Sequence, residues 1–320
     1  MDVRADLPLD PQFKAILAAL PPFPDIRTLQ IPQLRKIVHQ SSTTAPPLPV
    51  ALGSINDRTI PGPGGALPVR IYTPTGNGPF PIIVYFHGGG WVVCDLDTHD
   101  MIARGLSHAS GAILISVDYR LAPEHRFPAA IDDAWAAVRW ASQHAIELGG
   151  HPKLLAVAGD SAGGVIASAI ALRARDEKGP ELAAQVNFYG SCNYPSQLTA
   201  SAREFAEGPL LSKTDIDYFW SLYLSDPARD QHHPWASPIR AASLAGLPPA
   251  FVATAEIDPS RDDTEAFAAK LAAAGTSVTQ RRYPGMVHGF LSFLGTIDGA
   301  QRAVDECSAW LKQQFARAPA

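Results

Sequence analysis

The chain has 320 residues, of which 46% are hydrophobic and 18% are charged. This composition supports a large buried core and excludes a disordered chain, which has fewer apolar residues and a higher net charge. The net charge of −5 gives no electrostatic basis for binding nucleic acid or an anionic membrane surface. The sequence therefore indicates a globular protein with one large domain or two smaller ones.

The three cysteines are Cys94, Cys192 and Cys307, and their wide spacing forms neither a disulfide framework nor a metal-binding or redox motif. The first residues are charged, and no apolar stretch of a signal peptide follows them. No apolar run reaches the ~18 residues that a membrane-spanning helix needs. We therefore expect a soluble, cytoplasmic protein that spans no membrane and binds no metal.

Two amphipathic helices are predicted at the start of the chain. The first has Asp10 as its N-cap and Pro11 as its first residue, and the second begins at Pro32. A proline-rich connector at residues 45–49 separates both helices from the rest of the chain. We interpret residues 1–50 as one part of a cap.

Short apolar and β-branched runs recur after about residue 54, and the later runs alternate with helical patterns. This alternation predicts a mostly parallel sheet covered by helices on both faces. The first two runs have no predicted helix between them, so we expect them to form an antiparallel edge. The predicted strands are 69–73, 82–86, 112–117, 154–158, 185–189, 250–254 and 278–283. The predicted helices follow Pro128, start at Ser161, run from Ser260 to Gly275, and start at Gln301.

The segment 193–235 interrupts this alternation and contains one predicted helix, at 212–224. An insertion at the carboxyl end of a strand lies where open α/β sheets bind ligands. We interpret it as the second part of the cap. Residues 51–192 and 236–320 then form the catalytic domain.

The stretch 159–163 reads Gly-Asp-Ser-Ala-Gly and lies between a predicted strand and a predicted buried helix. This is the context of a G-x-S-x-G nucleophile turn, in which the serine hydroxyl projects above the sheet. Small residues on either side let the strand and the helix approach each other, and the helix N-terminus adds partial positive charge. The motif predicts Ser161 as a nucleophile.

His87 and three successive glycines follow the predicted strand 82–86. Glycines allow backbone N–H groups to approach a ligand closely, and such donors stabilise the oxyanion formed when an ester carbonyl is attacked. We predict an oxyanion hole made by the N–H groups of Gly89, Gly90 and Ala162. His87 is expected to shape the turn by hydrogen bonding.

Together, four stretches of the chain resemble motifs of the bacterial hormone-sensitive-lipase-like esterases, also called family IV. The resemblance runs from about residue 50 to the C-terminus, and the N-terminal helices resemble that family's cap. It implies an α/β-hydrolase fold with a mostly parallel eight-stranded sheet, helices on both faces and a helical cap. It also implies a Ser-Asp-His triad, short to medium acyl substrates and no cofactor. The stretches are HGGGW at 87–91, DYRLAPE at 118–124, GDSAGG at 159–164 and HGF at 288–290.

The serine needs a base, and in this fold the triad order is serine, acid, histidine. His288 lies five residues beyond the predicted strand 278–283, on the same edge of the sheet as Ser161. His232 and His233 also follow the serine, but they lie in the inserted segment. We predict His288 as the base. The stretch 118–124 is expected to brace the oxyanion loop.

The acid is expected in the loop after the predicted strand 250–254, where Asp258 matches the family's position. Asp262 and Asp263 are rivals, but Ser260 and Asp263 form an S-x-x-D pair typical of a helix start. Glu256 is a further candidate. We predict Asp258 as the acid that orients the imidazole. Two residues depart from the family pattern, which more often has leucine at Ser260 and proline at Gly190.

The leading hypothesis is hydrolysis of a small-molecule carboxylic ester through an acyl-enzyme. An amidase or a long-chain lipase on the same triad, and a non-catalytic small-molecule receptor, are the alternatives. A homodimer through an edge strand is compatible with the sequence. Phe13 and Phe219 are hypothesised to face the pocket from the cap. Candidate pocket residues, for each of which core packing is an equal explanation, are Trp91, Leu210, Phe219 and Phe290.

Overall fold

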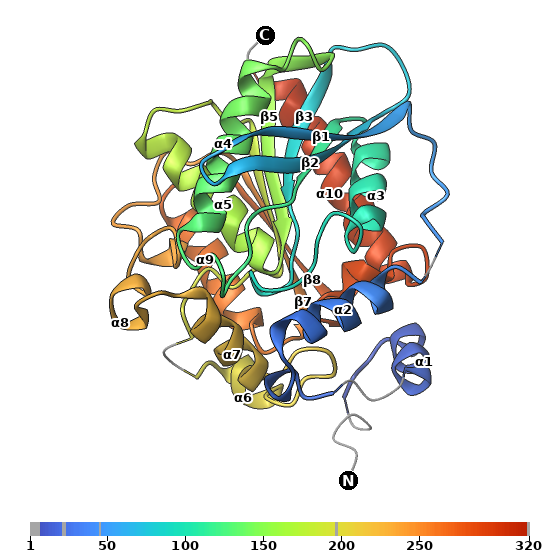
Figure 1. Ribbon diagram of the computed structural model, residues 1–320, viewed down its shortest axis with the longest axis vertical. Coiled ribbons are helices and arrows are strands. Elements are labelled where there is room, and N and C mark those ends of the chain that lie inside the picture. The colour runs from blue at the N-terminus through green and yellow to red at the C-terminus, as the bar shows by residue number, and fades with distance from the viewer. Residues whose placement is uncertain (1–6, 21–23, 45, 196–197, 319–320) are drawn as a thin grey trace.

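The computed structural model describes residues 7–20, 24–44, 46–195 and 198–318. These residues contain an eight-stranded sheet with the order β1-β2-β4-β3-β5-β6-β7-β8 (Figure 1). Strands β3 to β8 run parallel to one another, whereas β2 is antiparallel to both β1 and β4. The predicted mostly parallel sheet is confirmed. The strands are β1 (Ser54–Gly62), β2 (Gly65–Thr73), β3 (Phe80–Phe86), β4 (Ile113–Val117), β5 (Gly150–Asp160), β6 (Ala184–Phe188), β7 (Ala250–Ile257) and β8 (Val278–Val287).

The antiparallel edge of the sheet differs from the expected one. Residues 69–73 lie in β2, which pairs with β1 and β4, but residues 82–86 lie in β3, between β4 and β5. The two predicted strands are therefore not neighbours. The pattern missed β1 because it is an exposed edge strand in which Ile60 alone is buried, so it has no apolar run.

Helices cover both faces of the sheet, as predicted. Alternate residues of β3 point to opposite faces, with Ile83 and Tyr85 toward α3 and α10, and Val84 and Phe86 toward α4, α5 and α9. Because both faces are covered, β3 is a continuous apolar run rather than an alternating one. The helices are α3 (Asp100–Ser110), α4 (Ala129–Gln143), α5 (Ala162–Asp176), α9 (Arg261–Ala273) and α10 (Asp298–Arg317).

The remaining helices come from the two segments 1–50 and 193–235. Helices α1, α2, α6 and α7 lie together at the end of the molecule shown lowest in Figure 1. The expected cap of α1 is present, since the Asp10 carboxylate accepts a hydrogen bond from the N–H of Gln12. These helices are α1 (Pro11–Ala19), α2 (Ile31–Ser42), α6 (Ala200–Glu204), α7 (Lys213–Tyr223) and α8 (Pro227–Asp230).

The stretch 118–124 connects β4 to α4 and contacts the loop after β3, as expected. The Arg120 guanidinium binds the buried carboxylate of Asp133 in α4 through both oxygens. The Tyr119 hydroxyl donates to the carbonyl of His87 at 2.8 Å. The described part of the chain contains no helix with the length and apolar character needed to cross a bilayer.

At Gly163, α5 lies very close to the end of β3. A Cβ atom at this position would lie 1.9 Å from the carbonyl oxygen of Phe86 and 2.6 Å from that of His87. Both neighbours are backbone atoms, so neither can turn away. We expect Gly163→Ala to lower the free energy of unfolding by about 3 kcal/mol, at the upper end of the cost of overpacking a core. Urea unfolding measures this loss.

Gly111 provides the control for this variant. It has a left-handed backbone with φ of +66°, but a Cβ atom there would meet nothing within 4 Å. Gly111→Ala should therefore cost only the conformational term of about 1–2 kcal/mol. Equal losses for the two variants would contradict the steric explanation at Gly163.

Candidate active site

Ser161 lies in the tight turn between the end of β5 and the start of α5. Its backbone has φ of +52° and ψ of −121°, a conformation that non-glycine residues seldom adopt. The turn is held because the N–H of Ser161 donates to the carbonyl of Phe188 in the neighbouring strand at 2.8 Å. This conformation lets the hydroxyl project beyond the carboxyl ends of the strands, at the N-terminus of the buried helix α5.

His288 and Asp258 lie at the same edge of the sheet as Ser161, since His288 directly follows β8 and Asp258 directly follows β7. The Ser161 Oγ is 2.8 Å from the Nε2 of His288, and the His288 Nδ1 is 2.8 Å from the Oδ2 of Asp258. The carboxylate of Asp258 is fully buried, and the imidazole is 12% exposed. With a proton on Nδ1, the ring donates to Asp258 and its Nε2 can accept the serine proton.

The second carboxylate oxygen of Asp258 is also bonded. It accepts from the N–H of Ser260 at 2.8 Å and from the Ser260 hydroxyl at 2.7 Å. The predicted capping of α9 by Ser260 is therefore wrong, because its hydroxyl is used by Asp258 and makes no cap hydrogen bond. A leucine at this position could supply the N–H bond alone. The departure from the family pattern thus adds a donor to the acid.

The rival carboxylates have partners elsewhere. Asp262 accepts from the N–H of Ser201, and Asp263 accepts from the side chain of Asn193. Glu256 accepts from the N–H of Gly285. These groups hold together the loops around the site, so of the carboxylates considered Asp258 is the one bonded to His288.

The oxyanion loop, residues 87–90, faces Ser161. Gly89 and Gly90 have φ of +104° and +59°, which glycine adopts without steric cost. Within the described residues, the N–H groups of Gly89, Gly90 and Ala162 have no hydrogen-bond acceptor. These three donors are therefore available to a ligand oxygen. Gly88 differs, because its N–H donates to Asp160 at 2.9 Å.

His87 has the position expected of a residue that shapes this loop. Its buried ring stacks on Tyr119 at 4.3 Å, and its Nδ1 lies 2.7 Å from the carbonyl oxygen of Gly88. Burial, with a smaller effect of nearby His99, lowers the pKa of His87 to about 4. The ring is therefore neutral near pH 7 and donates from Nδ1.

Asp160 is a buried carboxylate behind the oxyanion loop. Its Oδ1 accepts from the Tyr85 hydroxyl at 2.5 Å and from the N–H of Gly88, and lies 3.4 Å from the Nε2 of His99. Burial raises the pKa of Asp160, but the charge of His99 and the bonds from His99 and Tyr85 outweigh burial and leave that pKa below its ordinary value. Sequence reasoning did not identify His99 or Tyr85.

The candidate pocket residues fall into two groups. Trp91 is 4% exposed and stacks on Tyr223 at 4.1 Å, and Phe290 is fully buried against Tyr189 at 5.4 Å. Their burial among aromatic rings accounts for both by packing. By contrast, Phe219 of α7 lies against the oxyanion loop, since a Cβ atom at Gly90 would be 2.4 Å from its ring.

The two other cap candidates also differ. Leu210 is 42% exposed, which leaves its side chain open to solvent. Phe13 is fully buried and meets Phe293 edge to face at 5.0 Å. Phe13 is therefore packed against the hydrolase core, while Phe219 is the candidate in contact with the oxyanion loop.

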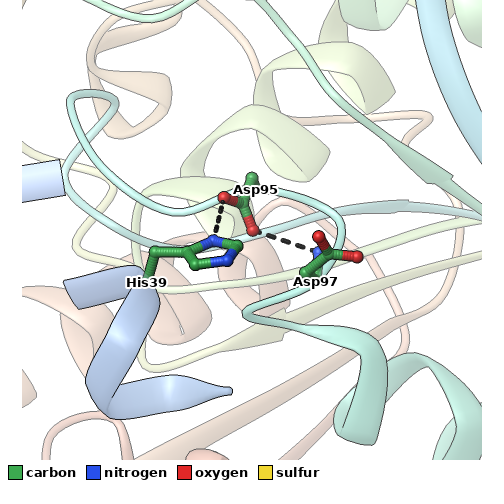
Figure 2. A group of neighbouring side chains, drawn as sticks. All are labelled: His39, Asp95 and Asp97. Atoms are coloured by element: carbon green, nitrogen blue, oxygen red, sulfur yellow. Dashed lines mark hydrogen bonds and ion pairs between the residues drawn. The ribbon is translucent and has the colours of Figure 1, made fainter. Parts of the chain in front are cut away.

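One group of side chains has the spacing of metal ligands. Figure 2 shows His39 of α2 facing Asp95 and Asp97 in the loop after β3, with ligand atoms within 4.8 Å of one another. Their atoms already have partners, however. The Asp95 Oδ2 binds the Nδ1 of His39, its Oδ1 accepts from the N–H groups of Asp97 and Thr98, and Asp97 pairs with Arg70. The arrangement is that of a hydrogen-bonded turn, and we assign no metal to it.

Residues 83–292 match a protein family described by its alpha/beta hydrolase fold. The chain belongs to this family. Within it, the chain is 44% identical to the carboxylesterase NlhH of Mycobacterium tuberculosis over 81% of this chain and 82% of that protein. It is 42% identical to the carboxylic ester hydrolase LipN of the same organism, over 82% of this chain and 71% of LipN. The resemblance to the hormone-sensitive-lipase-like esterases is confirmed.

A solved α/β-hydrolase structure extends this similarity to almost the whole chain. It is a hyperthermophilic esterase from the archaeon Pyrobaculum calidifontis, with a TM-score of 0.90 and 37% sequence identity. The alignment covers 96% of this chain and 99% of that one. The α/β-hydrolase fold is thereby confirmed by sequence family and by structure.

Asp160 provides a test of how the oxyanion loop is held. Asp160→Ala leaves the Tyr85 hydroxyl without its acceptor inside the protein, and it removes the nearer of the two acceptors of the Gly88 N–H, the other being the Nε2 of His99. We expect it to lower the free energy of unfolding by about 3–5 kcal/mol, as is typical when one partner of a buried charged pair is removed. The measurement is urea unfolding at pH 7.

Tyr85→Phe is the matched variant, because it removes a single bond to the same carboxylate and keeps the shape of the ring. Its expected loss is about 2 kcal/mol. A loss for Asp160→Ala no larger than that of Tyr85→Phe would show that the carboxylate does not organise the loop.

Proposed function

We propose that the chain is a serine carboxylesterase that hydrolyses short- to medium-chain carboxylic esters through an acyl-enzyme. The observation that carries the proposal is the continuous series of hydrogen bonds from Ser161 through His288 to Asp258. This series lies beside three backbone N–H groups that have no acceptor in the described part of the chain. The names of the related carboxylesterases support the same activity.

In the first half of the proposed reaction, the Ser161 Oγ attacks the ester carbonyl and its proton passes to the Nε2 of His288. The negative charge that develops on the carbonyl oxygen is stabilised by the N–H groups of Gly89, Gly90 and Ala162. His288 then gives the proton to the leaving alcohol. Asp258 orients the imidazole and stabilises its charged form without becoming protonated.

In the second half, water replaces the alcohol. His288 takes a proton from the water as it attacks the acyl-enzyme, and returns that proton to Ser161 as the acid product leaves. The Ser260 hydroxyl bonded to Asp258 keeps the carboxylate in one orientation during both halves. Each step uses side chains and backbone groups of this chain alone, so the proposal includes no cofactor.

The cap is also part of the proposal, with segments 1–50 and 193–235 covering the catalytic domain formed by 51–192 and 236–320. The gathering of α1, α2, α6 and α7 at one end supports it (Figure 1). The contact of Phe219 in α7 with the loop at Gly90, beside the proposed oxyanion hole, is further support. The cap would therefore limit the volume next to the acyl group.

Two finer expectations remain predictions of this proposal. One is a cytoplasmic enzyme acting on small-molecule esters. The other is a homodimer through an edge strand, for which the outer strands β1 and β8 are the available edges. An amidase, a long-chain lipase or a non-catalytic receptor would be separated from the proposal by the substrates described below.

Ser161→Ala removes the proposed nucleophile. We expect it to lower kcat for p-nitrophenyl butyrate by about 10⁴-fold or more, because no covalent intermediate can form. The melting temperature should stay the same or rise, since the left-handed backbone at this position is unchanged. Ser168→Ala is the control, because Ser168 lies on the same helix and its hydroxyl donates to a backbone carbonyl of Gly164. Wild-type turnover in Ser161→Ala would refute the proposal.

Phe219→Ala opens space beside Gly90. We expect the preferred acyl chain to become longer by about two to four carbons in a series of p-nitrophenyl esters from acetate to palmitate. Leu210→Ala, at an exposed position of the same inserted segment, should leave the series unchanged. An unchanged preference in Phe219→Ala contradicts its role in the pocket.

The alternative functions have their own tests. An anilide in the same series of substrates detects amidase activity. A fluorophosphonate that does not label the protein favours a non-catalytic receptor.

A further inference from the structure

Arg35 of α2 makes four hydrogen bonds to segments far from it in the sequence. Its Nε donates to the carbonyl of Val92 at 2.8 Å, and its Nη2 donates to the carbonyl of Ala122 at 2.9 Å. Its two terminal nitrogens also bind both carboxylate oxygens of Glu124, at 2.9 and 2.6 Å. A planar guanidinium held at all of these points has one orientation.

Of the two carbonyl groups that Arg35 binds, that of Val92 belongs to the turn that carries the glycines of residues 88–90, and that of Ala122 belongs to the stretch 118–124. Within this turn, the N–H groups of Val92 and Val93 both donate to the carbonyl of Gly89 at 3.0 Å. The N–H of Ala122 donates to the carbonyl of Trp91 at 2.8 Å. Arg35 closes this set of bonds into a ring, because it connects the carbonyl of Val92 to that of Ala122.

The ring fixes the direction of the peptide group between Gly89 and Gly90. The carbonyl of this group accepts from Val92 and Val93, and Arg35 in turn holds the peptide group between Val92 and Val93. The N–H of Gly90 is in this same peptide group and points away from the held carbonyl, and it has no acceptor in the described residues. Removing Arg35 would leave the Val92 carbonyl without this donor. The peptide groups could then rotate, and the Gly90 N–H would no longer be held in one direction.

Two other contacts show that α2 is firmly placed against this loop. Leu34, next to Arg35, is 1% exposed and belongs to the same apolar cluster as Trp91 and Val92. One helical turn further along, the Nδ1 of His39 binds Asp95 at 2.8 Å, as Figure 2 shows. The helix thus contacts the loop both before and after the position of Arg35.

We propose that Arg35 is a positioning residue that holds the Gly90 N–H of the proposed oxyanion hole in the direction needed to bind the transition state. This inference rests on the proposed esterase function. It makes α2 part of the catalytic apparatus, in addition to any role in covering the substrate. The Arg35 side chain touches no reacting atom, so its effect should appear in the chemical step.

The test measures kcat and KM for p-nitrophenyl butyrate in wild type, Arg35→Ala and Arg35→Lys. We expect Arg35→Ala to lower kcat by about 10–100-fold, a part of the 10²–10³-fold typical of losing one oxyanion donor, with KM changed less than about threefold. Arg35→Lys keeps one charged donor group, so its kcat should lie between those of wild type and Arg35→Ala. A trifluoromethyl ketone inhibitor forms an adduct with Ser161 that carries a negative oxygen in the proposed oxyanion hole. Its inhibition constant should therefore rise in proportion to the loss of kcat.

Arg27→Ala is the matched control, since Arg27 lies in the same N-terminal segment and binds both oxygens of exposed Asp25. It should leave kcat and the inhibition constant unchanged. If Arg35→Ala cannot be purified in folded form, Glu124→Ala replaces it, because it removes the carboxylate anchor and leaves α2 intact. Its expected loss of kcat is about three- to tenfold.

The outcomes separate the inference from the function on which it rests. Wild-type hydrolysis that Ser161→Ala abolishes establishes the function. An Arg35 variant that is folded but has unchanged kcat, or a rise in KM alone, then overturns the inference. A wild-type chain that hydrolyses no ester overturns the proposed function, and the inference with it.

Discussion

The tight turn between β5 and α5 is the constraint on which the rest of the site depends. At Gly163 the helix approaches the backbone of β3 so closely that no side chain fits between them. At the same turn Ser161 has a positive φ with a cost of about 1–3 kcal/mol, which the packing of α5 inside the core offsets. The approach at Gly163 brings the end of β3, with its glycine loop, next to the serine. The proposed nucleophile and the N–H groups of the glycine loop therefore lie together at one contact.

Local patterns in the sequence were sufficient to predict this arrangement in outline. The turn at Ser161 has glycines on either side and lies between an apolar strand and an apolar helix, so the local chemistry and the fold agree there. His288 and Asp258 could be located because each follows a strand of a parallel sheet, whose carboxyl ends meet at one edge. The apolar runs of the central strands were recognised for the same reason, since burial on both faces leaves few polar residues in them.

Contacts between distant residues could not be predicted in this way. The bond from Arg35 to Val92 joins residues 57 positions apart, and nothing near either residue in the sequence indicates the other. The hydroxyl of Ser260 could serve the start of α9 or the carboxylate of Asp258, and only the folded geometry decides between them. Strand β1 was missed because an exposed edge strand has no apolar run. The position of β2 was missed because the pairing of strands depends on how the chain crosses between them, which local patterns do not show.

The hydrogen bonds of Arg35 indicate which N-terminal residues the hydrolase portion of this protein needs for a complete structure. The family match starts at residue 83, so α2 lies wholly outside it, yet α2 supplies the donors for Val92 and Ala122 inside it. The region that the family model matches is therefore smaller than the unit that is structurally complete. In a chimaera that joins the hydrolase portion of this chain to a foreign N-terminal segment, the Val92 and Ala122 carbonyls lose their donor. The foreign segment restores it only if it has a guanidinium at the same position.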